Sequence, residues 1–172
     1  MAAQPARHPT LQGSDGTLMV RVESLTLGAS LQRDPNIRAV FVSLEVLGAS
    51  FNTPDLRKVS PPICVNETFT VPIEPDSKAQ QELLRVMTAQ YGDRKGSDIA
   101  FTVCWYDAAS SSGDNGEPIA FGSVSIRGIW DSRRDMASQV VKLIDDDTQE
   151  ETHIVISTSV IPVLTRIMPR SR

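Results

Sequence analysis

The residue types that most often carry chemistry are few and widely spaced in this sequence. The two histidines, His8 and His153, do not share a helix face, so a zinc site built on two histidines of one helix is excluded. The chain contains no glycine-rich phosphate loop and no Gly-x-Ser-x-Gly turn around a nucleophile. Because no acid–base or nucleophile–base set is present, we expect neither an enzyme nor a bound cofactor.

Cysteine usage and overall charge narrow the class of protein further. Cys64 and Cys104 are too few for a disulfide framework, and the N-terminal stretch lacks the apolar core of a secretory signal. We therefore expect a cytoplasmic protein in which both cysteines are buried thiols. No apolar run approaches the roughly 20 residues that cross a membrane. A net charge of −4 argues against nucleic acid as a partner.

Charged residues gather in short clusters that have two functional interpretations. The basic ones are Arg57-Lys58, Arg94-Lys95, Arg133-Arg134 and the tail residues Arg166, Arg170 and Arg172. They could attract anionic lipid or steer an acidic partner, and the alternative is ordinary solvated surface. The acidic run from Asp145 to Glu151 is typical of a solvated hairpin turn, although it could also contact a basic protein.

Alternating apolar residues separated by turn residues predict an all-β antiparallel sandwich. Seven strands are read directly, over residues 17–27, 38–47, 64–73, 98–106, 118–126, 140–144 and 153–164. The first strand changes phase between Val22 and Leu25, which predicts a β-bulge. One helix is predicted from Asp76 or Ser77 to Tyr91, and a short helical turn over 130–136. We expect a lead-in over 1–16, one domain over 17–165 and a basic tail over 166–172.

Several of these segments resemble a C2 domain. Asp34-Pro35 followed by Val40-Phe41-Val42 is similar to the segment after the first C2 loop. The stretch from Phe101 to Asp107, a polar loop and then Ile119 to Ile126 resembles the C2 strand–loop–strand pattern, and Ile129-Trp130-Asp131 fits the helical turn that follows. The resemblance implies a C2-type sandwich of eight antiparallel strands with one inserted helix.

A narrower resemblance rests on an ordered set of short motifs. They are Ser24-Leu25-Thr26-Leu27, Asp34-Pro35-Asn36-Ile37-Arg38, Leu47-Gly48, Thr53-Pro54-Asp55-Leu56-Arg57-Lys58, Phe101-Thr102-Val103 and Arg134-Asp135. The set is similar to the C-terminal C2 domain of the retinitis pigmentosa GTPase regulator-interacting protein family, over roughly residues 17–164. Those proteins carry coiled coils before their C2 domains, whereas this chain has no heptad repeat.

The narrower resemblance implies a scaffold at the ciliary transition zone or basal body that binds an RCC1-like propeller. A calcium-binding C2 domain has an Asp six residues before Asp34, where this chain has Gly28, and a second Asp after Asp107, where it has Ala108 and Ala109. Asp34, Asp107 and Asp114 remain. Because calcium takes six to eight oxygen ligands, three carboxylates are too few, and we expect no metal site. We expect Asp34 to cap a turn instead.

We predict that the partner contacts two loops and one tryptophan. The contact residues would be Thr53, Asp55, Leu56, Arg57, Lys58, Asp114, Asn115 and Trp130. Replacing Arg57 and Lys58 with Glu is expected to weaken partner binding and to leave the melting temperature nearly unchanged. The alternative function is a peripheral membrane C2 domain that binds anionic lipid.

Overall fold

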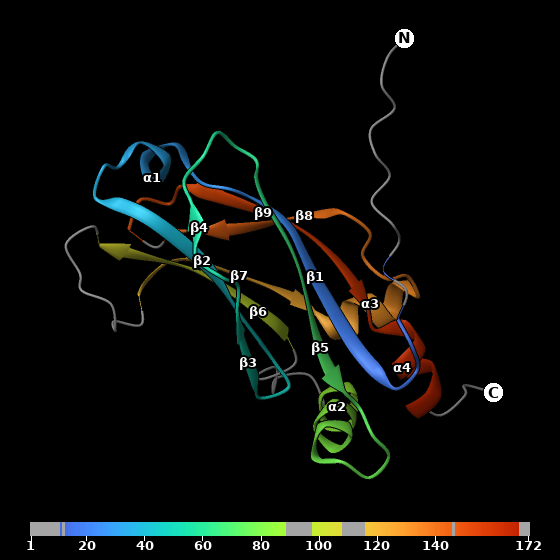
Figure 1. Cartoon of the computed structure of the whole chain (residues 1–172). Helices are drawn as coiled ribbons and strands as arrows, with labels where there is room; N and C mark the ends of the chain where they lie inside the picture. The colour runs from blue at the N-terminus through green and yellow to red at the C-terminus, as the bar shows by residue number, and fades with distance from the viewer. Residues whose placement is uncertain (1–10, 12, 89–97, 108–115, 146, 169–172) are drawn as a thin grey trace.

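The strands form one continuous antiparallel β-sheet in the computed structural model, which describes residues 11, 13–88, 98–107, 116–145 and 147–168. The strand order is β3-β2-β6-β7-β8-β9-β1-β5, and β4 pairs with β2 outside this order. The sheet folds over at the β7–β8 pair, so that its two halves, β3-β2-β6-β7 and β8-β9-β1-β5, face each other as the two sheets of a sandwich (Figure 1). Within the described residues the strands are β1 (Thr17–Thr26), β2 (Ile37–Val46), β3 (Ala49–Asn52), β4 (Leu56–Arg57), β5 (Ile63–Pro72), β6 (Asp98–Asp107), β7 (Glu117–Ser125), β8 (Gln139–Ile144) and β9 (Glu151–Ser159). The predicted all-β antiparallel class is therefore confirmed.

Helices lie at the ends of the sandwich. In the described part of the chain they are α1 (Ala29–Arg33), α2 (Lys78–Thr88), α3 (Ile126–Ser132) and α4 (Ile161–Ile167). The longest, α2, is the predicted inserted helix, and of the two candidate caps it is Ser77 whose hydroxyl accepts a hydrogen bond from the Gln80 amide at 3.2 Å. None of these helices is long and apolar enough to cross a membrane.

The core fills the space between the two sheets because apolar residues alternate along the strands. On β1, Leu18, Val20 and Val22 are buried, and the pairing register then shifts between Val22 and Ser24. This shift is the predicted β-bulge, and it returns Leu25 to the buried face. Glu23 is the extra residue of the bulge, so its side chain does not follow the alternation of buried and less buried residues along β1.

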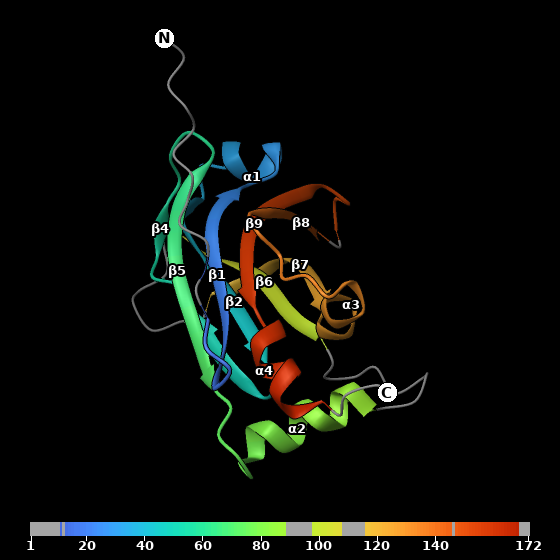
Figure 2. The same cartoon turned by 90° about the vertical axis from the view of Figure 1, so that its right-hand side faces the viewer.

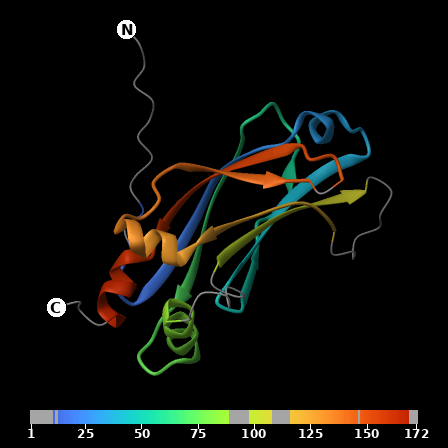
Figure 3. The same cartoon turned by 180° about the vertical axis from the view of Figure 1, so that it is seen from behind.

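The two sheets meet along one seam and approach each other at their other edges. At the seam, β7 pairs with β8 at a single position, Phe121 opposite Ile144. Figure 3 shows the two strands spreading apart from there toward α3. At the far edges the rings of Phe51 on β3 and Phe69 on β5 lie 5.5 Å apart between centroids. The second view shows β5, β1 and β9 side by side, with α2 and α4 at one end (Figure 2).

Three local predictions are wrong. The stretch over residues 48–62, predicted as a loop, contains the short strands β3 and β4. The last strand ends at Ser159, because Pro162 occupies the first turn of α4, where proline is favoured. The helical turn predicted over 130–136 begins earlier, at Ile126, because the Ser125 hydroxyl accepts the Gly128 amide and caps α3.

The domain boundaries stay predictions, although β1 begins at Thr17 and Arg166 lies within α4. The Arg166 guanidinium donates to the Ile73 carbonyl at 2.6 Å and so connects α4 to the residue that follows β5.

Cys104 is buried, as expected, and burial raises the pKa of its thiol. Cys64 is exposed, because it faces outward on β5, so its predicted burial is wrong.

Candidate functional site

The loop end of the sandwich, which comprises residues 28–36 and 55–62, contains four of the eight predicted contact residues. Lys58 joins its two segments. The Lys58 ammonium donates to the carbonyl oxygens of Leu31 at 2.9 Å, Gln32 at 3.1 Å and Asp34 at 2.6 Å. These carbonyls belong to the last turn of α1 and its C-cap, where backbone oxygens have no partner within the helix. Lys58 therefore caps α1 from a distant part of the chain.

Side chains from the β8–β9 turn and from the first residues of β9 hold the beginning of α1. The Glu150 carboxylate accepts the Ser30 amide at 2.9 Å, and the Thr152 hydroxyl accepts the Gly28 amide at 3.1 Å. A Cβ at position 28 would lie 2.8 Å from the Glu150 side chain, so only glycine fits without a shift. Acceptors at the start of α1 and a cation at its end match the direction of the helix dipole. The short helix is thereby fixed at both ends.

The residual acidic positions do not form a metal cluster among the described residues. Asp34 accepts the Asn36 amide at 2.9 Å, which confirms its predicted role as a turn cap. Asp107 is described by its backbone, which pairs with Ile37 at the end of β6, and Asp114 lies outside the described residues. No group of three His, Cys, Asp or Glu side chains in the described ranges is placed to hold a metal ion. The expectation of no metal site stays a prediction.

The predicted contact residues of the 53–58 segment differ in exposure. Thr53 is 4% exposed: its hydroxyl accepts the Val42 amide at 2.9 Å, and its own backbone amide donates to the Val42 carbonyl at 2.9 Å. Leu56 is half-buried and pairs with Val40. Asp55 and Arg57 are exposed, so they are the residues of this segment that a partner can reach.

The contacts of Lys58 correct the expectation for the double substitution of Arg57 and Lys58. A glutamate at position 58 would face the three carbonyl oxygens that the ammonium now binds. The double variant would therefore lose stability as well as any binding. Arg57 alone is the suitable probe of the surface, because its side chain is exposed.

The remaining predicted contact residues are Asp114, Asn115 and Trp130. Asp114 and Asn115 fall outside the described residues. Trp130 lies on α3, away from the loop end (Figure 1), and is half-buried against the core. The Arg133 guanidinium stacks 3.6 Å above the centroid of its ring. The structure therefore does not bring Trp130 together with the 53–58 segment.

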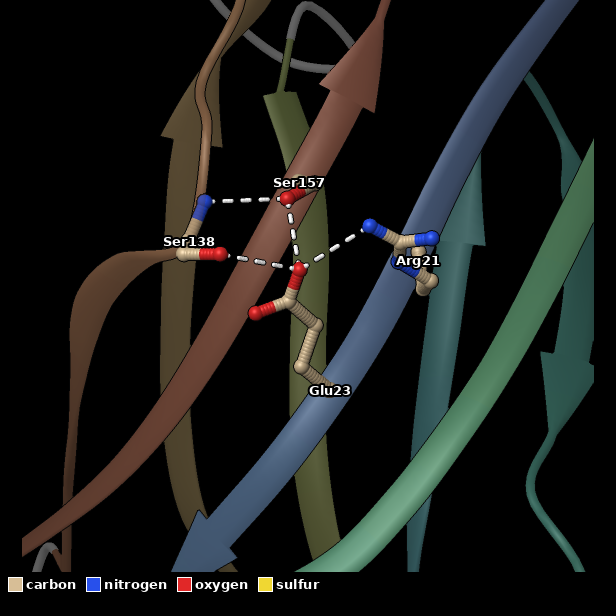
Figure 4. Close-up of polar contacts among 4 residues, drawn as sticks. All are labelled: Arg21, Glu23, Ser138 and Ser157. Atoms are coloured by element: carbon tan, nitrogen blue, oxygen red, sulfur yellow. Dashed lines mark hydrogen bonds and ion pairs between the residues drawn. The ribbon is translucent and has the colours of Figure 1, made fainter. Parts of the chain in front are cut away.

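A polar cluster on the outer face of β1 and β9 was not predicted from the sequence. One carboxylate oxygen of Glu23 accepts hydrogen bonds from Ser157 at 2.8 Å, Ser138 at 3.1 Å and Arg21 at 3.2 Å (Figure 4). The Ser138 amide in turn donates to the Ser157 hydroxyl at 2.9 Å. The carboxylate thus joins β1, β9 and the segment that leads into β8.

Burial and hydrogen bonding act in opposite directions on Glu23. Burial on its own raises the pKa of this carboxyl, but the hydrogen bonds from Ser138, Ser157 and Arg21 outweigh it, and the net effect lowers the pKa. The group is therefore ionised at neutral pH. The phase slip in β1 marks the position, whereas the partners lie 115 and 134 residues away in sequence and leave no local pattern.

Comparison with known proteins identifies the fold. No protein-family model and no curated protein sequence matches the chain. Among solved structures, the chain is similar to the C2A domain of plant Extended Synaptotagmin 1, with a TM-score of 0.53 and 12% identity over 86% of this chain and 95% of that one. A structure of the C2A and C2B domains of Extended-Synaptotagmin 2 matches with a TM-score of 0.53 and 9% identity, over 92% of this chain and 45% of that one.

A third structure, of a C2 domain-containing protein, gives a TM-score of 0.50 and 13% identity, over 84% of this chain and 87% of that one. The chain therefore has the C2 β-sandwich fold, as the sequence predicted. At these identities the likeness concerns the fold, and the narrower resemblance to one family stays a prediction.

Proposed function

We propose that this chain is a non-catalytic C2 module that binds a protein partner through its loop end without calcium. The observation that carries the proposal is the Lys58 ammonium, which is bonded to three carbonyl oxygens of the 31–34 segment. A cation that belongs to the protein already satisfies oxygens of the loop next to Asp34. Calcium-binding C2 domains have an aspartate where this chain has Gly28, so one of their carboxylate ligands is absent at this position. The loop end is thus held in shape by side chains of the chain itself.

The exposed charges of the loop end favour an acidic partner surface. Arg33 and Arg57 are exposed, and Lys58 adds a positive charge with no carboxylate within ion-pair distance among the described residues. These three basic residues outnumber the two acidic residues of the loop end, Asp34 and Asp55. Such a patch steers association with a negatively charged surface. From the narrower sequence resemblance, we propose an RCC1-like propeller as the first partner to test and the base of the cilium as the location.

One observation favours anionic lipid as the second candidate. Val59 is 52% exposed, and its carbonyl accepts a hydrogen bond from Gln32, which places it beside α1. An apolar side chain among basic residues is a combination that can insert into a membrane surface while the cations contact lipid headgroups. In this case, anionic vesicles would bind the chain and high salt would release it.

Titration calorimetry with purified components separates the two candidates. The chain is titrated with the RCC1-like propeller of the GTPase regulator, once with calcium and once with a chelator. We expect equal affinities in the two conditions and a loss of about tenfold for Arg57→Glu, because an exposed charge at an interface steers association. Arg134→Glu, at the opposite end of the fold, is the matched control and should bind as the wild type does.

Two results would contradict the protein-binding proposal. Binding only in the presence of calcium would overturn calcium independence, and wild-type affinity for Arg57→Glu would remove the loop end from the interface. Failure to bind the propeller, together with binding to phosphatidylserine vesicles but not to phosphatidylcholine vesicles, would favour the lipid function instead.

A further inference from the structure

The seam between the two sheets opens into a groove beside α3. Gly122 lies so close to β8 that a Cβ at this position would be 2.6 Å from the Lys142 carbonyl oxygen. The strands cross there, and among the described residues they pair at Phe121 opposite Ile144 alone. In the described part of the chain, residues 139–142 of β8 pair with β9 on one side and with no strand on the side of β7.

The space left by the diverging strands is a cavity of about 520 Å³. Its apolar lining comes from Val124 on β7, Ile129 on α3 and Met136 before β8, and Gln139 lines it at the beginning of β8. This cavity and the adjoining edge of β8 are called the α3–β8 groove below. Val140, next to Gln139, is 59% exposed, so apolar surface continues from the groove onto the outer face of β8.

Two charged side chains line the groove, and they differ in whether their charge is already paired with other groups of the protein. Asp135 is occupied, because its carboxylate accepts the amides of Val160 at 2.8 Å and Ile161 at 3.2 Å and the Thr158 hydroxyl at 3.0 Å. Arg134 is exposed, and no carboxylate among the described residues lies within ion-pair distance of its guanidinium. The groove therefore offers an apolar interior, a strand edge and one available cation.

We propose that the α3–β8 groove binds an extended segment of a partner protein whose apolar and acidic residues alternate. The segment adds to the edge of β8 at Gln139–Val141, its apolar side chains enter the groove, and an acidic side chain pairs with Arg134. The termini of this chain do not fit, because residues 1–10 and 169–172 contain arginines and no acidic residue. The site is separate from the loop end and does not depend on the function proposed for it.

A random peptide library displayed on phage tests this proposal with the full chain. We expect the wild type to enrich peptides in which apolar residues alternate with Asp or Glu. A synthetic copy of an enriched peptide should bind Arg134→Glu at least about tenfold more weakly, since the charge pair becomes a repulsion. Arg57→Glu is the matched control and should bind the peptide as the wild type does. Equal melting temperatures for the three proteins exclude unfolding as the cause.

Amide shifts in an NMR titration with the same peptide locate the contact. We expect the largest changes at residues 139–142 and slower hydrogen exchange of their amides, because strand addition forms backbone hydrogen bonds. The proposal is overturned if no alternating apolar–acidic peptides are enriched, if Arg134→Glu binds as tightly as the wild type, or if the shifts lie at the loop end or along β5.

Discussion

The loop end and the outer face of β1 and β9 each hold one ionised side chain with three hydrogen bonds, but the partners differ. Glu23 receives its bonds from side chains, and one donor is the guanidinium of Arg21, which neutralises the charge. Lys58 gives its bonds to backbone carbonyls, and no carboxylate among the described residues pairs with it. The same number of contacts thus leaves one region nearly neutral and the other positive.

This difference separates a structural network from a surface that can also carry function. The Glu23 carboxylate is buried, so its bonds mainly stabilise the packing of three segments. The Lys58 ammonium fixes α1, and its charge still contributes to the field outside the loop end. We therefore expect substitutions at Glu23 to act on stability alone, and substitutions around Lys58 to act on stability and on association.

The largest expected effect is that of Glu23→Ala. The change leaves the hydroxyls of Ser138 and Ser157 and the Arg21 guanidinium without their shared acceptor, which should lower the free energy of unfolding by about 3 kcal/mol. Urea denaturation followed by circular dichroism measures it. Glu45→Ala on β2, where the side chain is exposed, is the control and should change stability by less than about 0.5 kcal/mol. A small effect at Glu23 would mean that the network is not structural.

A smaller effect is expected for Lys58→Met, which keeps the apolar stem and removes the ammonium. Three carbonyl oxygens lose a charged donor but remain partly accessible to water, so we expect a loss of about 1–2 kcal/mol. Hydrogen exchange should become faster at the amides of Gln32 and Asp34, which belong to α1 and its cap. Arg57→Met is the matched control. Unchanged exchange in α1 would contradict the capping role.

The smallest expected effect is a change in the stability of the fold with pH. It tests whether the negative charge of Glu23, and not only the space that its side chain fills, contributes to stability. Since the pKa of Glu23 is lowered in the folded state, its ionised form stabilises the fold above the unfolded pKa, near 4.5, and this contribution disappears as pH falls through the folded pKa. Urea midpoints at falling pH, compared with Glu23→Gln, measure it. The difference between the two proteins should narrow on acidification, and a constant difference would exclude a contribution from the charge.

The sequence predicted the parts of the fold that depend on local patterns. The alternation and phase slip of β1 indicated both the strand and its bulge, and Ser77 was one of two candidate caps for α2. Beyond such patterns prediction was limited. The strands β3 and β4 are too short to show a period, and α4 follows β9 so closely that its apolar residues extended the predicted strand.

The candidate site was predicted in part, for the same physical reason. The 53–58 segment was chosen by its charges and its place in a set of motifs, and the structure places Arg57 on the surface. The roles of Thr53 and Lys58 depend on contacts with Val42 and α1, and the Lys58 contacts cross 24 to 27 residues of chain. Lysine bound to backbone carbonyls has no sequence signature, because every residue supplies a carbonyl.

The close crossing at Gly122 has a consequence for how this fold tolerates variation. Its neighbours Phe121 and Ser123 are exposed, so many side chains fit at those positions. At position 122 even alanine would meet a backbone oxygen and the Leu143 side chain, and backbone cannot move aside as a flexible side chain can. In a library that contains every single substitution, glycine should therefore be retained at position 122, whereas many residues should be tolerated at the positions on either side of it.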